Sequence, residues 1–158
     1  MAKYAVVRTD NMSGTVEGKN TVSLVYENDI ENGCVLAIGD FIDGERELRE
    51  GTIPDKAAEL RDVALLAAPE VVKASSQNTL SEFINEAGTP IRGYRFTPKD
   101  VFGLTKEGFA SGDNPEVGNI VELNGTTKLH AVASATESTT TVGKIVLFED
   151  PYYVVEVE

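Results

Sequence analysis

Short apolar runs separated by turn residues extend along most of the chain, a pattern typical of strands joined by tight connections. In the last run, Tyr152–Glu158, side chains alternate so that Tyr153, Val155 and Val157 share one face. About nine short strands at fairly even spacing favour a sandwich or a barrel. The predicted strands are Lys3–Arg8, Thr21–Glu27, Cys34–Ile38, Val63–Ala67, Ile91–Phe96, Asn119–Leu123, Lys128–Ala133, Val142–Phe148 and Tyr152–Glu158, with Val101–Thr105 as a further candidate.

Turn signals fit these runs. Asn124-Gly125 is the strongest hairpin signal, because this dipeptide readily adopts the positive φ angles of a hairpin turn. Asn32-Gly33 and Asp43-Gly44 predict two further turns, and Asp150-Pro151 separates the last two strands. The small polar stretch 134–141 is expected to be an exposed loop.

One short helix is predicted near Leu80–Glu86. Thr79 is placed to cap it, and Glu82, three residues later, completes a capping box. The apolar face would hold Leu80, Phe83 and Ile84, and Gly88 would end the helix.

Two polar segments lack apolar periodicity and are predicted to be arms that contact a partner, Arg8–Asn20 and Glu45–Leu60. Deletion of Ser13–Lys19 is therefore expected to leave the body folded and to weaken attachment. The sequence is interpreted as a single β-rich domain, 1–158, with one short helix and an extended segment around 45–60.

Composition excludes some partners. The 158 residues include 26 acidic and 14 basic side chains, a net charge of −12, and the basic residues form no stripe. Phosphate backbones repel such a chain, so neither nucleic acid nor an anionic membrane is expected as a partner. No signal peptide or apolar span is recognisable, which predicts assembly in a cytoplasm.

Candidate chemistry is sparse. Cys34 is the only cysteine and lies in an apolar run, which predicts a buried, inert thiol. His130 is the only histidine and lacks the companions that zinc or a catalytic triad requires. Asp113-Asn114 does not match a calcium loop and is interpreted as a turn. No catalytic, cofactor-binding or metal-binding residue is assigned, and the chain is predicted not to be an enzyme.

Several stretches resemble capsid decoration (cement) proteins and other head structural proteins of tailed phages of Gram-positive bacteria. The resemblance covers roughly the last two thirds of the chain and brings no catalytic residue with it. It is carried by Leu60–Glu70, Phe83–Gly88, Ile91–Phe96, Asp100–Phe102, Val117–Leu123 and Tyr153–Val157.

The resemblance implies a viral structural protein that binds the outer surface of the phage head and stabilises it. Its partner would be the major capsid protein, and it would form a homo-oligomer such as a trimer on the virion. Capsid contacts are expected through strand edges such as Tyr152–Val157. Two alternatives are another virion component (tail tube, adaptor or head-fibre base) and a carbohydrate-binding β module. The absence of Trp counts against the second alternative.

Overall fold

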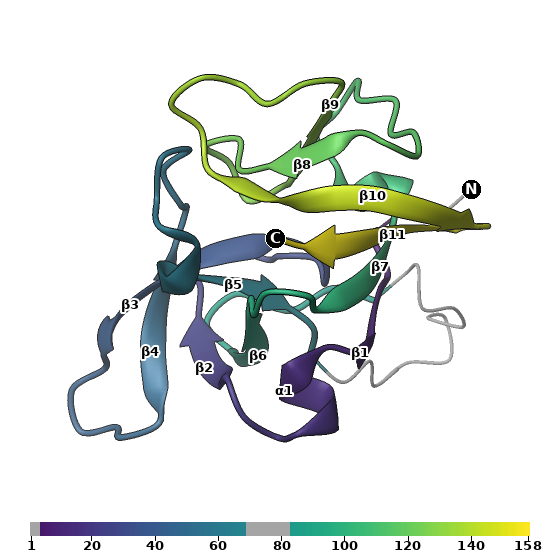
Figure 1. Cartoon of the computed structure of the whole chain (residues 1–158). Helices are drawn as coiled ribbons and strands as arrows, with labels where there is room; N and C mark the ends of the chain where they lie inside the picture. Colours follow the sequence, from purple (N-terminus) through teal and green to yellow (C-terminus); the bar gives the residue numbers. More distant parts are fainter. Residues whose placement is uncertain (1–3, 69–82) are drawn as a thin grey trace.

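The chain folds mainly as β-structure, in two sheets of which one is a closed barrel, and this confirms the predicted fold class. The computed structural model describes residues 4–68 and 83–158 (Figure 1). The barrel strands are β2 (Thr21–Val25), β3 (Val35–Phe41), β4 (Leu48–Thr52), β5 (Val63–Leu66) and β6 (Pro90–Arg95). The second sheet holds β1 (Val7–Asn11), β7 (Val101–Thr105), β8 (Ile120–Glu122), β9 (His130–Val132), β10 (Thr141–Glu149) and β11 (Tyr152–Val157). Helical turns are α1 (Ser13–Val16), η1 (Leu60–Asp62) and η3 (Lys106–Gly108).

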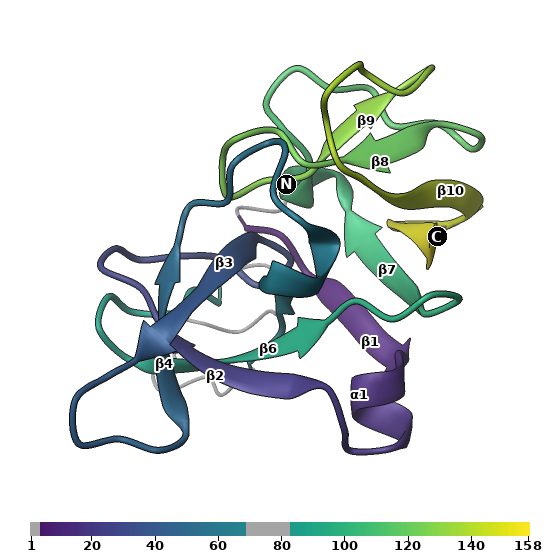
Figure 2. The same cartoon turned by 60° about the vertical axis from the view of Figure 1, so that its left-hand side comes forward.

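The barrel closes in the order β2-β4-β3-β5-β6. Its strands β2, β3, β4 and β6 are labelled in the lower left of Figure 2. The β2–β4 pair is parallel and the other pairs are antiparallel. Alternate side chains such as Leu24, Leu36 and Leu66 belong to one buried cluster inside it. Gly51 of β4 faces the same interior, because a Cβ there would lie 2.7 Å from Leu36 Cδ1. Closure leaves none of these five strands at a sheet edge.

The second sheet is open and antiparallel, in the order β1-β7-β11-β10-β8-β9. β11 lies in its middle and pairs with β7 on one side and β10 on the other. The prediction that Tyr152–Val157 offers a free edge is therefore wrong, since both of its backbone edges are occupied.

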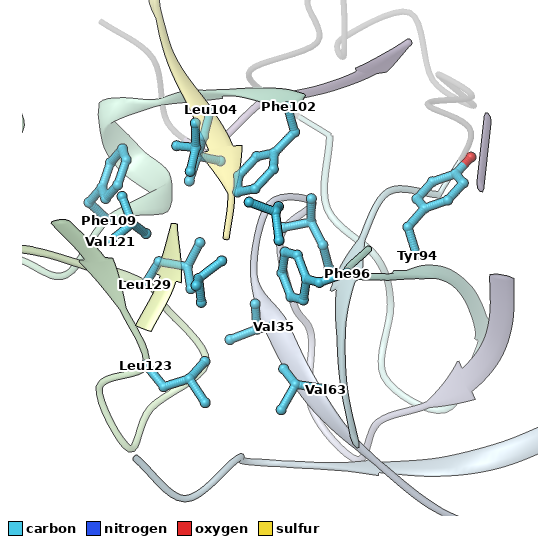
Figure 3. Packing of buried hydrophobic residues seen from close by; sticks show 14 of the residues in the cluster. Val35, Val63, Tyr94, Phe96, Phe102, Leu104, Phe109, Val121, Leu123 and Leu129 are labelled. Atoms are coloured by element: carbon cyan, nitrogen blue, oxygen red, sulfur yellow. The ribbon is translucent and has the colours of Figure 1, made fainter. Parts of the chain in front are cut away.

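A larger core joins the barrel to the open sheet (Figure 3). Strand β5 contributes to both cores. Ala64 and Leu66 point into the barrel, while Val63 and Leu65 point toward the open sheet. This is why the run is apolar at every position. Phe96 follows β6 and meets Phe102 of β7, with ring centroids 5.9 Å apart.

Most strand predictions are confirmed. β2 and β7 begin at the predicted residues, and Val101–Thr105 matches at both ends. The hairpin around Asn124-Gly125 also forms, as β8 paired with β9, although its connection covers residues 123–129. Gly125 has φ of +71°, the positive value that favours glycine there.

The helix prediction is wrong for residues 83–86, and residues 78–82 lie outside the described chain. Asn85 instead forms a β-bridge with Ile30. Its side-chain amide donates to Ile30 O and to Asn32 Oδ1, each at 3.0 Å. These hydrogen bonds satisfy a buried amide, and so tertiary pairing outweighs the local capping signal.

Neither predicted arm is free along its length. Arg8–Asn20 contributes to β1 and α1, with Met12 fully buried and Gly14 packed against Tyr94. Deletion of Ser13–Lys19 would remove this packing, so it is no longer expected to spare the fold. In Glu45–Leu60, residues Leu48–Thr52 form β4 between β2 and β3.

Candidate functional site

His130 and Asp113, singled out in the sequence, lie together at the β9 edge. His130 Nδ1 is 2.8 Å from Asp113 Oδ2, which also accepts a hydrogen bond from Ala131 N at 2.9 Å. Asp113 is largely buried, with 9% of its side chain exposed. The pair thus ties the loop before β8 to β9. Among the described residues no Ser, Thr or Cys hydrogen-bonds to His130, and no three ligating side chains form a metal cluster.

Cys34 is buried, as the sequence predicts, and it belongs to the apolar cluster inside the barrel. It is 2% exposed, and burial, followed by the nearby Glu31 carboxylate, raises the pKa of its thiol from 9.0 to about 12. A thiol that keeps its proton at neutral pH is a poor nucleophile.

Glu122 is a buried carboxylate that the sequence analysis did not single out. It is 1% exposed and accepts hydrogen bonds from Thr136 N at 3.0 Å and Thr136 Oγ1 at 2.6 Å. These bonds attach the exposed 134–140 loop to β8. The carboxylate therefore has a structural partner and is not an open acid–base group.

The outer half of β10 forms an exposed apolar edge. β8 pairs with β10 only over Thr141–Lys144. Backbone hydrogen bonds from Gly118 N to Ile145 O and from Ile145 N to Asn119 O extend the contact by one residue. From Val146 to Glu149 the described chain pairs β10 with β11 alone. Of seven large apolar side chains exposed in the described residues, three lie in this half of β10: Val146 (44%), Leu147 (49%) and Phe148 (43%). A fourth, Val117 (57%), precedes Gly118, whose backbone N–H donates to Ile145 O. These four residues and the unpaired backbone are termed the β10 edge.

Aromatic packing holds the β10 edge in place. The Phe148 and Tyr153 ring centroids are 4.7 Å apart, and Tyr153 meets Phe109 edge-to-face at 5.9 Å. A register shift between Ile145 and Leu147 bulges the strand at Val146. The edge is thus an ordered apolar surface with free backbone groups, the features by which a strand accepts a protein neighbour.

A second surface lies at the end of the barrel where β2 and β4 begin and β3 and β6 end. A hollow of about 390 Å³ is lined there by Arg49, Arg92 and Arg95, with Phe41, Glu47, Thr21, Val22 and Ser23. This surface is termed the arginine hollow. Arg49 Nε donates to Gly39 O at 2.7 Å, and its guanidinium lies 4.6 Å from the Phe41 ring centroid. Arg95 Nη1 donates to Arg61 O at 3.1 Å.

Sequence reasoning missed both surfaces. Val146, Leu147 and Phe148 were predicted as ordinary strand residues, and nothing in their pattern shows that β8 ends short of them. Arg92 and Arg95 come from one strand and Arg49 from another, so only the strand order of the barrel brings them together.

No protein-family model, no curated protein and no solved structure matches this chain. Across residues 4–68 and 83–158, no helix has the length and apolar character needed to cross a bilayer.

Proposed function

We propose that this protein is a capsid decoration protein, which binds the outer surface of a tailed-phage head and stabilises it. The observation that carries the proposal is the β10 edge, an ordered apolar strand edge that is open to a protein neighbour. Such an edge offers backbone hydrogen bonds together with apolar contact, which suits attachment to a preformed protein shell. The resemblance to head structural proteins of phages supplies the identity of that shell.

The net charge of the chain supports a location on the outer surface of the head. A chain with a net charge of −12 is poorly suited to the DNA-filled interior, where phosphate groups would repel it. On the outer surface the charge maintains solubility and leaves the apolar edge to supply affinity. Stabilisation then follows from mass action, at about 2.7 kcal/mol per site when the free protein is at a hundred times its dissociation constant.

The test compares heads of the phage that encodes this chain, made with and without it. Heads that carry the protein should withstand heating or low salt longer, because a ligand specific for the assembled shell opposes its rupture. Equal rupture rates, or a location inside the shell, would refute the proposal. A single ring of copies at the portal or in the tail would instead indicate the alternative virion component.

A pair of variants tests the contact itself. Val146→Asp places a charge on the β10 edge and should weaken head binding at least about tenfold, since a buried unpaired carboxylate costs several kcal/mol. Ile53→Asp is the matched control, because Ile53 is 53% exposed but lies directly after barrel strand β4, away from the open sheet. If both variants bind heads as the wild type does, the β10 edge is not the contact. Circular dichroism checks that both are folded.

A further inference from the structure

The arginine hollow is a local excess of positive charge on an acidic protein. Three arginine residues line the hollow, together with a single acidic residue, Glu47. Among the described residues, no ion pair within 4.0 Å engages Arg49, Arg92 or Arg95. Arg92 is exposed, so its guanidinium is accessible to an incoming anion.

Guanidinium groups prefer carboxylates and phosphates, which they bind through paired hydrogen bonds. The hollow also presents an apolar surface, because Phe41 is 55% exposed despite its contact with Arg49. An occupant that matches both features carries carboxylates next to an exposed apolar side chain.

We propose that the arginine hollow binds the β10–β11 turn of a second copy of this chain. Glu149 and Asp150 are exposed in that turn, directly after the exposed side chains Leu147 and Phe148. The turn therefore offers two carboxylates and adjacent apolar surface to three guanidinium groups and Phe41. Complementarity of this kind orients the two copies and selects against unrelated neighbours.

The two surfaces lie too far apart to meet within one chain. In Figure 1 the β10–β11 turn is at the far right, whereas the β3–β4 connection beside the hollow is at the lower left. A contact between them joins different surfaces of two copies and is heterologous. Such contacts close into a ring when the rotation between neighbours permits, and otherwise extend as a filament.

The total charge of two copies opposes this contact only weakly. At physiological ionic strength the screening length is about 8 Å, so most of the spread carboxylates do not act across the interface, while touching groups do. A polyanion such as DNA would meet the whole acidic surface as well as the hollow, which makes it the poorer occupant.

The proposal goes beyond the capsid role and is tested with the purified protein alone, by analytical ultracentrifugation over a range of concentrations. The wild type should self-associate. Arg92→Glu and Glu149→Arg should each weaken self-association at least about tenfold, because each places like charges in contact. Arg92→Glu combined with Glu149→Arg in one chain exchanges the two charges and should restore self-association to within about threefold of the wild type.

Lys106→Glu is the matched control, because Lys106 is exposed in η3, outside the hollow, and undergoes the same change of charge. It should associate as the wild type does. A wild type that stays monomeric at all concentrations would overturn the proposal, as would a double variant that associates no better than either single variant. Circular dichroism confirms the folding of each variant, and head binding, measured separately, reports on the capsid role.

Discussion

The barrel and the open sheet solve the problem of unpaired strand edges in opposite ways. The barrel closes through the parallel β2–β4 pair, so every one of its strands has two neighbours. The open sheet keeps terminal strands, β1 and β9, and leaves the outer half of β10 paired on one side only.

The difference limits what each region offers a partner. A closed barrel exposes side chains but no strand edge, and the arginine hollow is one surface of this kind. An open sheet also exposes backbone groups, and at the β10 edge these stand beside apolar side chains. We therefore expect charge to control recognition at the barrel, and strand addition to control it at the open sheet.

The largest effect is expected from the core that joins the two regions. Phe102→Ala should lower the free energy of unfolding by about 3–5 kcal/mol, since Phe102 is 1% exposed and packs against Phe96. Leu36→Ala, inside the barrel, should cost about 2–5 kcal/mol. Urea denaturation followed by circular dichroism and tyrosine fluorescence should show one transition for both variants. Two separate transitions would mean that the barrel and the open sheet fold independently.

The next largest effect is expected from adding a methyl group at one glycine of each region. A Cβ at Gly143 in β10 would overlap the backbone carbonyl of Glu156 in β11, whereas one at Gly51 in β4 would meet the flexible end of Leu36. Gly143→Ala should therefore cost about 2–3 kcal/mol and Gly51→Ala less than about 1 kcal/mol. Thermal unfolding measures both. A larger cost at Gly51 would show that the barrel interior is packed more rigidly than the open sheet.

The buried thiol of Cys34 should make the stability of the protein depend on pH in the alkaline range. The Cys34 pKa of about 12 exceeds the ordinary 9.0, so the contribution of this thiol to stability is complete below pH 9 and declines as pH rises toward 12. Between pH 9 and 11 the wild type should lose roughly 2 kcal/mol relative to Cys34→Ala. Urea titrations of both proteins at each pH measure the difference.

A thiol placed at the β10 edge should be far more reactive than Cys34. In Val146→Cys combined with Cys34→Ala, the new thiol should react quickly with an aromatic disulfide, whereas Cys34 of the folded wild type should not react. Equal reaction rates in the two proteins would contradict the proposed seclusion of the barrel interior.

The smallest effect is expected at the β9 edge. Asp113→Ala removes an acceptor from His130 and Ala131 and should cost about 1–2 kcal/mol. Asp43→Ala, in the exposed β3–β4 connection, should change stability by less than about 0.5 kcal/mol. Thermal melts of both variants test whether this edge depends on the Asp113 carboxylate.

Local patterns predicted most strands because alternation and turn residues act over a few neighbouring positions. Val101–Thr105 is an example, with both ends correct. The same patterns failed for β4, whose residues Leu48–Thr52 are largely polar and show no alternation. β4 is a strand because β2 and β3 supply its hydrogen bonds on both sides. The failed helix at 83–86 has the same cause, since Asn85 pairs with Ile30, 55 positions away.

The sequence by itself determined the mainly β fold class, the burial of Cys34 and the acidic character of the chain, because these depend on composition and short-range periodicity. Tertiary structure decided which strands close and which stay open, and with that the exposure of Val146–Phe148 and the gathering of Arg49, Arg92 and Arg95. Both surfaces depend on strand order and register. These are fixed by contacts between residues distant in the chain, which no local pattern encodes.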